Sequence, residues 1–181
     1  LADGLSAEDC ALQSMPDASP VKWHLAHTTW FFETFVLERC DAAHKPFDPA
    51  FRFLFNSYYN GVGEQYPRPQ RGMLSRPAFA EVMRYRAQVD ERMRALLAGR
   101  TLATEALGLI ELGLHHEQQH QELLLMDVKH VLSLNPLEPV YGGRPTETCA
   151  TGELGWLDVE GGLVDVGHRG GFYDSTGALR D

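Results

Sequence analysis

The sequence lacks an excess of basic residues. Lys and Arg number 16 against 25 Asp and Glu in a chain of 181 residues, which gives a net charge of -9 at pH 7. Binding to a phosphate backbone needs a surface rich in Lys and Arg. This balance therefore argues against a nucleic-acid partner, and we expect small molecules as partners instead.

The sequence is also poor in cysteine and in long apolar runs. Cys10, Cys40 and Cys149 are odd in number and form no C-x-x-C pair, which argues against a disulfide framework and is typical of a reducing cytosol. No apolar stretch approaches the about 18 residues of a membrane-spanning helix, and no signal peptide is recognisable. We therefore expect a soluble, cytoplasmic protein without a membrane partner.

Helical periodicity is the main pattern that the sequence does contain. Ser19 and Pro20 form an N-cap followed by proline, and they predict a helix over VKWHLAHTTWFFETFVLERC. Apolar residues recur at helical intervals over residues 77–99 and again over about 101–135, where Asn-Pro stops the helix. The first stretch, LADGLSAEDCALQSM, resembles the end of a further helix. We predict a mainly α fold, an up-and-down four-helix bundle.

The composition changes near residues 140–150. Residues 41–76, rich in Pro, Gly, Asn and aromatics, interrupt the helical part, and a loop of this length is typically functional. After Pro139 the chain reads as a linker and then becomes glycine-rich with short β-like runs. We divide it into a helical bundle over residues 1–140, a linker over 141–152 and the start of a second domain over 153–181.

The run HHEQQHQELLL, residues 115–125, fits two different metal sites. His116, Glu117 and His120 match H-E-x-x-H of zinc peptidases, while His116, His120 and Glu122 match a spacing used by mononuclear iron enzymes. On a helix of 100° per residue both histidines face the core, and their Cβ atoms lie about 6 Å apart. Glu122 lies about 120° from His116 and cannot easily share their metal. Glu117 flanks the site, where it could act as a peptidase base.

A third ligand decides between these interpretations. Downstream, His130 lies about 15 Å along the helix from His120, and His168 belongs to the tail. Upstream, His27 of WHLAHTTWFFE faces inward, although His24, one turn earlier, competes with it. Three imidazoles leave coordination positions free and suit Fe(II) as well as zinc. A metal-binding bundle without turnover fits the same spacing.

Four segments resemble a known family. SPVKWHLAHTTWFFE, FNSYYNGVG, RPQRGMLSRP and GLHHEQQHQELLLMDVKHVLSLNP are similar to the DinB-like N-terminal domain of ergothioneine-type sulfoxide synthases, over about residues 5–140. The resemblance implies a helical bundle that binds a mononuclear non-haem iron. It also implies an enzyme that uses O2 to join the thiol of γ-glutamylcysteine or cysteine to the imidazole of Nα-trimethylhistidine as a sulfoxide. A similar branch, the selenoneine synthases, uses a seleno-sugar donor.

The resemblance also assigns residues. It implies these Fe(II) ligands: His27, His116 and His120. It makes Gln119 a contact of Nα-trimethylhistidine, and it makes Arg68 and Arg71 the pair that binds the carboxylates of the thiol substrate. Guanidinium groups suit that bidentate task.

The tail resembles the opening of the family's second domain, an α+β domain related to formylglycine-generating enzymes. In the family that domain is long and supplies a catalytic tyrosine. Only its start is expected within residues 153–181, and STGALRD departs from the family's pattern. The sequence leaves open whether the chain is part of a longer two-domain protein. No catalytic residue is assigned to this chain.

Overall fold

The computed structural model describes residues 1–99, 101–142, 152 and 154–163. The described part is helical and contains no strand. Its long helices are α1 (Val21–Phe32), extended by the π-helical η2 (Glu33–Leu37) and by α2 (Glu38–Cys40), then α4 (Phe79–Gly99) and α5 (Thr104–Ser133). Its short elements are η1 (Asp9–Ala11), α3 (Phe51–Leu54), η3 (Asn60–Val62) and η4 (Arg68–Met73).

The three long helices that periodicity predicts are confirmed, with ends shifted by a few residues. The first begins at Val21, so that Pro20 occupies the N-cap position in place of Ser19. Ser19 has a different role, because its backbone N–H donates to Asp127 Oδ2 of α5 at 2.8 Å. The start of α1 is thereby attached to α5 through a buried carboxylate.

The expected fourth helix at the N-terminus is not observed, and this part of the prediction was wrong. The Ser6 backbone N–H donates to Asp9 Oδ2 at 2.9 Å, and the Asp9 N–H donates to Ser6 Oγ at 3.1 Å. This reciprocal pair closes a local turn, after which only the short η1 follows. Such a reciprocal pair is a capping box, which opens a helical turn, but the turn ends at Leu12, whose backbone is extended with ψ 144°.

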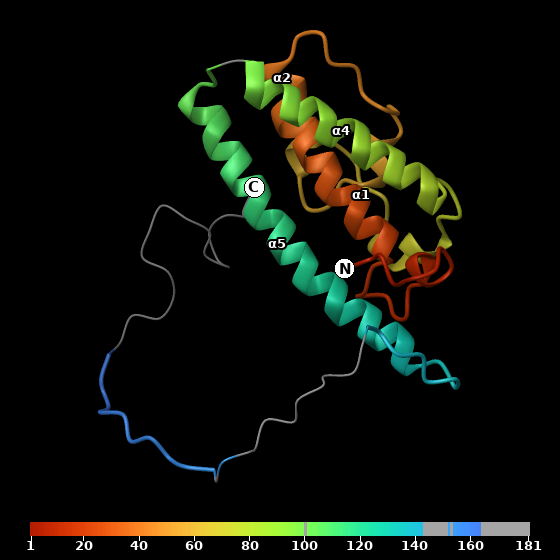
Figure 1. Cartoon of the computed structure of the whole chain (residues 1–181), viewed down its shortest axis with the longest axis vertical. Helices are drawn as coiled ribbons and strands as arrows, with labels where there is room; N and C mark the ends of the chain where they lie inside the picture. The colour runs from red at the N-terminus through yellow and green to blue at the C-terminus, as the bar shows by residue number, and fades with distance from the viewer. Residues whose placement is uncertain (100, 143–151, 153, 164–181) are drawn as a thin grey trace.

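The helices also do not alternate in direction as an up-and-down bundle requires. Lys22, near the start of α1, donates to the carbonyl of Pro77 before α4, and Asp41, after α2, pairs with Arg92 late in α4 at 3.7 Å. α1 and α4 therefore run in the same direction, and α5 runs opposite to both (Figure 1). The reason is the connection over residues 41–78, which is long enough to return the chain to its starting end, whereas short loops give antiparallel neighbours.

α1 is the central helix and packs against both α4 and α5 (Figure 1). The main core lies around α1 and α4 and includes Trp30, Phe31, Val82 and Tyr85. A smaller cluster joins the N-terminal segment and Val21 to the later part of α5. α1 and α5 approach closely at Gly113.

The close approach at Gly113 requires a residue without a side chain. A Cβ atom at this position would lie 2.6 Å from Phe32 Cε1 and 3.0 Å from Phe31 Cε1. The two helices can therefore meet closely one turn before His116. The missing side chain brings the histidines of α5 within reach of those of α1.

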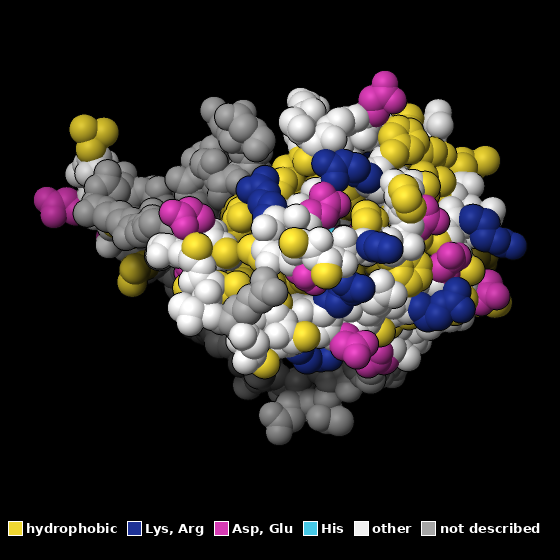
Figure 2. Space-filling model, turned by 90° about the horizontal axis from the view of Figure 1, so that it is seen from above, with side chains coloured by type: hydrophobic (Ala, Val, Ile, Leu, Met, Phe, Trp, Pro, Cys, Tyr) yellow, Lys and Arg dark blue, Asp and Glu magenta, His cyan; other side chains and the backbone are white. Residues whose placement is uncertain are grey.

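The surface carries charges of both signs. Figure 2 shows acidic and basic side chains interspersed with hydrophobic ones over the face seen from above. In the described part of the chain, no helix combines the length and the apolar character needed to cross a membrane.

The expected second domain receives no support from the described residues. Residues 154–163 form neither helix nor strand. Residue 153, residues 164–181 and most of the expected linker lie outside the described residues. The domain boundaries proposed from the sequence therefore stay predictions.

Candidate metal centre

Three histidines converge at the interface of α1 and α5. His27 comes from α1, and His116 and His120 come from successive turns of α5; one ring nitrogen of each lies within 4.8 Å of the others. His27 Nε2 and His116 Nε2 are 3.1 Å apart. Metal–imidazole bonds of about 2.0 to 2.1 Å place two ligand nitrogens about 3.0 to 3.4 Å apart. The observed separation lies within this range, and it is also a hydrogen-bond distance.

The surroundings of His27 orient its ring. His27 Nδ1 lies 2.6 Å from the carbonyl oxygen of Phe55, which can only accept, so the ring proton is on Nδ1 and Nε2 carries the lone pair. The ring is also stacked on Trp23, with centroids 4.6 Å apart. In contrast, His116 Nδ1 is buried without a hydrogen-bond partner in the described part.

The histidines are neutral near pH 7. Burial, followed by the neighbouring His116 and His120, lowers the pKa of His27 well below its ordinary value. Burial lowers the pKa of His116 to about 4, and burial together with His116 lowers the pKa of His120 to about 2. A metal ligand must be deprotonated, so these rings do not need to lose a proton before they bind an ion.

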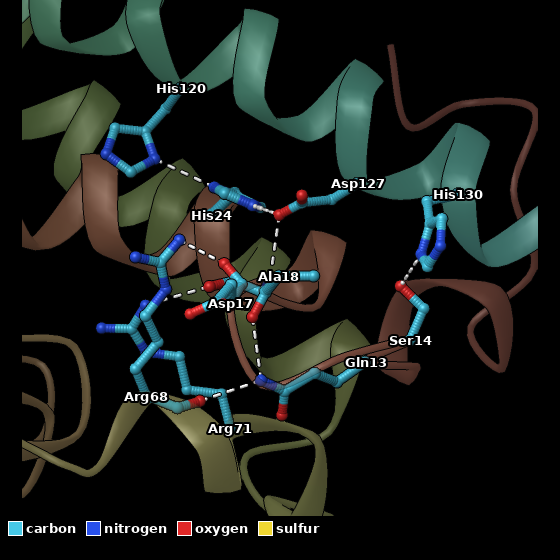
Figure 3. Close-up of polar contacts among 11 residues, drawn as sticks. Gln13, Ser14, Asp17, Ala18, His24, Arg68, Arg71, His120, Asp127 and His130 are labelled. Carbon is cyan, nitrogen blue, oxygen red and sulfur yellow. Dashed lines mark hydrogen bonds and ion pairs between the residues drawn. The ribbon is translucent and has the colours of Figure 1, made fainter.

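His24 lies behind His120, outside the three-histidine group. Figure 3 shows its ring between His120 and Asp127, both of α5. His24 Nδ1 is 2.9 Å from His120 Nδ1, and His24 Nε2 is 3.0 Å from Asp127 Oδ2. Burial lowers the pKa of His24 although Asp127 opposes the shift. Both ring nitrogens of His24 form hydrogen bonds, so neither is available to bind an ion together with the three histidines.

A cavity of about 200 Å³ opens onto the histidines. It is lined by all six site residues that the sequence singled out: His27, His116, His120, Gln119, Arg68 and Arg71. These come from α1, α5 and the long loop with η4. The fold thus gathers segments that are far apart in the sequence around one space.

Arg71 is a buried cation in this cavity. It is 3% exposed, donates to Ser19 Oγ at 2.9 Å and to Ser57 Oγ at 3.0 Å, and its guanidinium carbon lies 3.4 Å from the Trp23 ring centroid. Burial and then Arg68 lower its pKa to about 9, so it stays charged at neutral pH. Among the described residues no carboxylate forms an ion pair with it. A buried cation without a counter-charge attracts anions to the cavity that it lines.

Arg68, Gln119 and Tyr58 line the rest of the cavity. Arg68 donates to the Tyr58 hydroxyl at 3.0 Å and to the backbone carbonyl of Asp17, both of them neutral acceptors. Gln119 Oε1 is buried without a partner in the described part. Tyr58 adopts a left-handed backbone with φ 63°, which is uncommon for a residue other than glycine and is concentrated at functional sites.

Glu117 and Glu122 do not join the metal centre. Glu117 pairs with Arg86 at 2.7 Å and lines a second cavity, of about 260 Å³, which His120 also borders but His27 and His116 do not, while Glu122 is exposed. His130 is bonded to Ser14 at 2.8 Å. A peptidase base must be free to take a proton from a bound water, and the ion pair with Arg86 holds the Glu117 carboxylate instead, which disfavours the H-E-x-x-H interpretation.

Sequence reasoning missed three groups that shape the site. The hydroxyls of Ser19 and Ser57 hold Arg71, and nothing in the sequence marks either of them as a partner of an arginine. Asp127 could have been found, since an acidic residue about 20° from His116 on the core stripe of a helix needs a buried partner.

A comparison with protein families agrees with this geometry. The family model described as DinB superfamily matches residues 1–124. The chain belongs to the DinB superfamily. The matched region includes all three histidines and both arginines, and a DinB domain with a three-histidine cluster fits a metal-binding helical domain. No curated protein matches the sequence of this DinB-superfamily chain.

Proposed function

We propose that this chain is the metal-binding part of a non-haem iron, O2-dependent sulfoxide synthase that joins a thiol to Nα-trimethylhistidine. One observation carries the proposal. Three neutral imidazoles face the same cavity as two arginines that have no carboxylate partner among the described residues. Such a cavity can hold a metal ion and an anionic small molecule together.

The three histidines would hold the ion. His27, His116 and His120 supply one nitrogen each and leave further coordination positions open, and imidazole is a suitable ligand for Fe(II). When bound, Fe(II) supplies activation of O2 and deprotonation of the thiol. The low pKa values of the histidines keep their lone pairs available at neutral pH.

Arg68 and Arg71 would bind the thiol substrate. γ-Glutamylcysteine and cysteine both carry carboxylates, and a guanidinium can pair with a carboxylate through two parallel hydrogen bonds. Ser19 and Ser57 fix the position of Arg71 before any ligand arrives. A preorganised cation loses little freedom on binding.

Gln119 and Tyr58 would receive Nα-trimethylhistidine. The buried Gln119 Oε1 offers an acceptor for an imidazole N–H. The Tyr58 ring at the cavity offers a cation–π contact of about 0.5 to 2 kcal/mol to the trimethylammonium group. Trp30, which the same chemistry would suit, is fully buried in the core and does not line the cavity.

The reaction balances without a further reductant. The thiol loses its S–H proton and the imidazole loses a C–H proton as the C–S bond forms, and the sulfur is then oxidised to the sulfoxide. These two oxidations release four electrons, which reduce O2. One oxygen atom ends on sulfur, and the other leaves as water with the two protons.

The test is O2 consumption by the Fe(II)-loaded chain. We expect consumption that requires both Nα-trimethylhistidine and γ-glutamylcysteine or cysteine, with the sulfoxide detected by mass spectrometry. Arg71→Gln should weaken thiol binding about 10- to 100-fold, since a charge-assisted hydrogen bond contributes about 1.5 to 3 kcal/mol. Arg76→Gln is the matched control, because Arg76 belongs to the same loop but donates to Ser75 and does not line the cavity.

Other outcomes would favour the related candidates. Turnover with a seleno-sugar but with neither thiol would assign the chain to the selenoneine branch. Stoichiometric iron binding without O2 consumption for any substrate pair would indicate a metal-binding bundle without turnover and would overturn the proposed reaction.

A further inference from the structure

A chain of hydrogen bonds runs from Asp127 through His24 to His120 (Figure 3). Asp127 Oδ2 is held by the Ser19 backbone N–H at 2.8 Å and lies 3.0 Å from His24 Nε2. An ionised carboxylate can only accept a hydrogen bond. The proton on this side of His24 is therefore on Nε2.

The proton position on His24 determines the one on His120. Two N–H groups cannot face each other at the 2.9 Å that separates the two Nδ1 atoms. A neutral His24 with its proton on Nε2 has a lone pair on Nδ1, so His120 must donate from its own Nδ1. The remaining nitrogen of His120, Nε2, then carries a lone pair on the side of the ring away from His24.

We propose that Asp127 and His24 are positioning residues that fix His120 in the tautomer whose Nε2 is free to bind the metal. This inference rests on the proposed metal site. Without the chain, His120 could place its proton on either nitrogen, and the Nε2-protonated form cannot bind an ion through that atom. Partners behind a ligand histidine fix both its tautomer and its ring orientation.

His27 and His120 are therefore oriented by different means. A backbone carbonyl, that of Phe55, fixes the tautomer of His27, and no substitution can remove it. The tautomer of His120 depends on two side chains, His24 and Asp127, both of them buried. The second arrangement can be tested by mutation.

The first test measures tautomers directly in the metal-free protein. Protein labelled with [15N]histidine gives two-bond 1H–15N correlations that distinguish Nδ1–H from Nε2–H rings. We expect the Nδ1–H form for His120 and the Nε2–H form for His24 in the wild type. Replacement of Asp127 by Leu should produce a mixture at both rings, while an Nε2-protonated His120 in the wild type would overturn the proposal.

The second test compares two amides at position 24. Asn places its side-chain amide near the position of His Nδ1, facing His120, whereas Gln places it near Nε2, facing Asp127. We expect His24→Asn to bind Fe(II) or Co(II) nearly as the wild type does and His24→Gln to bind about 10- to 100-fold more weakly, measured by chelator competition. If His24 served only as the structural partner of Asp127, His24→Gln would bind the metal more tightly than His24→Asn. That result would overturn the proposal.

A matched control lies on the same helix. His130 of α5 also donates or accepts one side-chain hydrogen bond, with Ser14 Oγ at 2.8 Å (Figure 3). His130→Gln should leave the metal affinity and the His120 tautomer unchanged. A loss equal to that of His24→Gln would show a general effect of histidine removal and would also overturn the proposal.

The failure of the metal site and the failure of the positioning role are distinguishable. If the wild type binds no metal, both the proposed function and this inference fall. If the wild type binds metal and all the position-24 variants bind equally well, only the positioning role falls. Should His24→Gln not fold, as judged by circular dichroism, the Asp127→Leu tautomer spectra and the His24→Asn affinity decide the matter.

Discussion

Glu33 of η2, which faces α4, and the α5 residues that face α1 differ in how fully their buried polar atoms are hydrogen-bonded. Towards α4, Glu33 accepts from the Tyr85 hydroxyl at 2.7 Å and from the Phe47 backbone N–H at 3.0 Å. Towards α5, His116 Nδ1 and Asp127 Oδ1 are buried without partners in the described part. Since an unpartnered buried polar atom costs about 1 to 3 kcal/mol, the hydrogen bonds of Glu33 stabilise the contact with α4, whereas the unpartnered atoms of His116 and Asp127 lower the stability of the contact between α1 and α5.

The largest effect is expected when one of the metal-ligating histidines of α5 is replaced. His120→Ala should abolish stoichiometric iron binding, because two imidazoles of a three-ligand site do not retain the ion. Metal analysis of the purified variant measures this. A full equivalent of iron in His120→Ala would refute the assignment, and the same analysis of Tyr85→Phe, a variant at the contact with α4, should give the wild-type content.

The stability of the protein should depend on pH through His116 of α5. Burial lowers the pKa of His116 from 6.5 to about 4, so between these values the unfolded chain binds a proton that the folded chain excludes. The free energy of unfolding should therefore fall as the pH decreases from 6.5 to 4, by about 3 kcal/mol for this group. Above pH 6.5 the group has no effect.

Urea titrations of the metal-free protein at several pH values measure this decline. His116→Gln lacks the titrating ring and should show a shallower slope. Identical slopes for the two proteins would contradict the assignment of a low pKa to His116.

A mutation at the contact with α4 should change the stability of the protein but not its metal affinity. Tyr85→Phe removes one hydrogen bond from the buried Glu33 and should destabilise the protein by about 1 to 3 kcal/mol, as measured by chemical denaturation. Its metal affinity should not change, because neither residue lines the metal cavity. A large loss of metal affinity would show that the two contacts are coupled.

The smallest effects come from two glycines of α5. Gly113→Ala should destabilise by about 1 kcal/mol, at the low end for overpacking, since the partly buried Phe32 ring can turn away. Gly108→Ala should stabilise by about 0.4 to 1 kcal/mol, because a Cβ there meets nothing within 4 Å. Melting temperatures measure both, and shifts of the same sign would argue against the close contact of α1 with α5 at Gly113.

The inward face of α5 was predictable because the helix is regular at the site. Angular position alone placed His116 and His120 towards the core and Glu122 too far round the helix to share their metal. In the structure the two histidines join the cluster and Glu122 is exposed. The choice between His24 and His27 was not decided by periodicity, because the two lie only one turn apart on α1. It depends on how α1 is rotated against α5, which tertiary packing sets.

Pairs of residues that lie far apart in the chain could not be predicted from the sequence. Asp127 and His24 are 103 residues apart, and no local rule connects them. α1 and α4 run in the same direction because the connection over residues 41–78 returns the chain to the starting end of α1. Secondary-structure propensity does not predict this path. The N-terminal segment forms only a short helical turn, because the Ser6 and Asp9 side chains cap its start and the backbone becomes extended at Leu12.

Trp23 lies between the two halves of the cavity, with the His27 ring on one side and the Arg71 guanidinium in contact with its ring. Its indole emission should therefore change when an ion quenches it through His27 and change again when a carboxylate draws Arg71 away. Ion loading and ligand capture could then be followed in one fluorescence titration without any attached dye, with Trp23→Phe separating its signal from that of Trp30, whose ring is also stacked on His27 with centroids 5.5 Å apart.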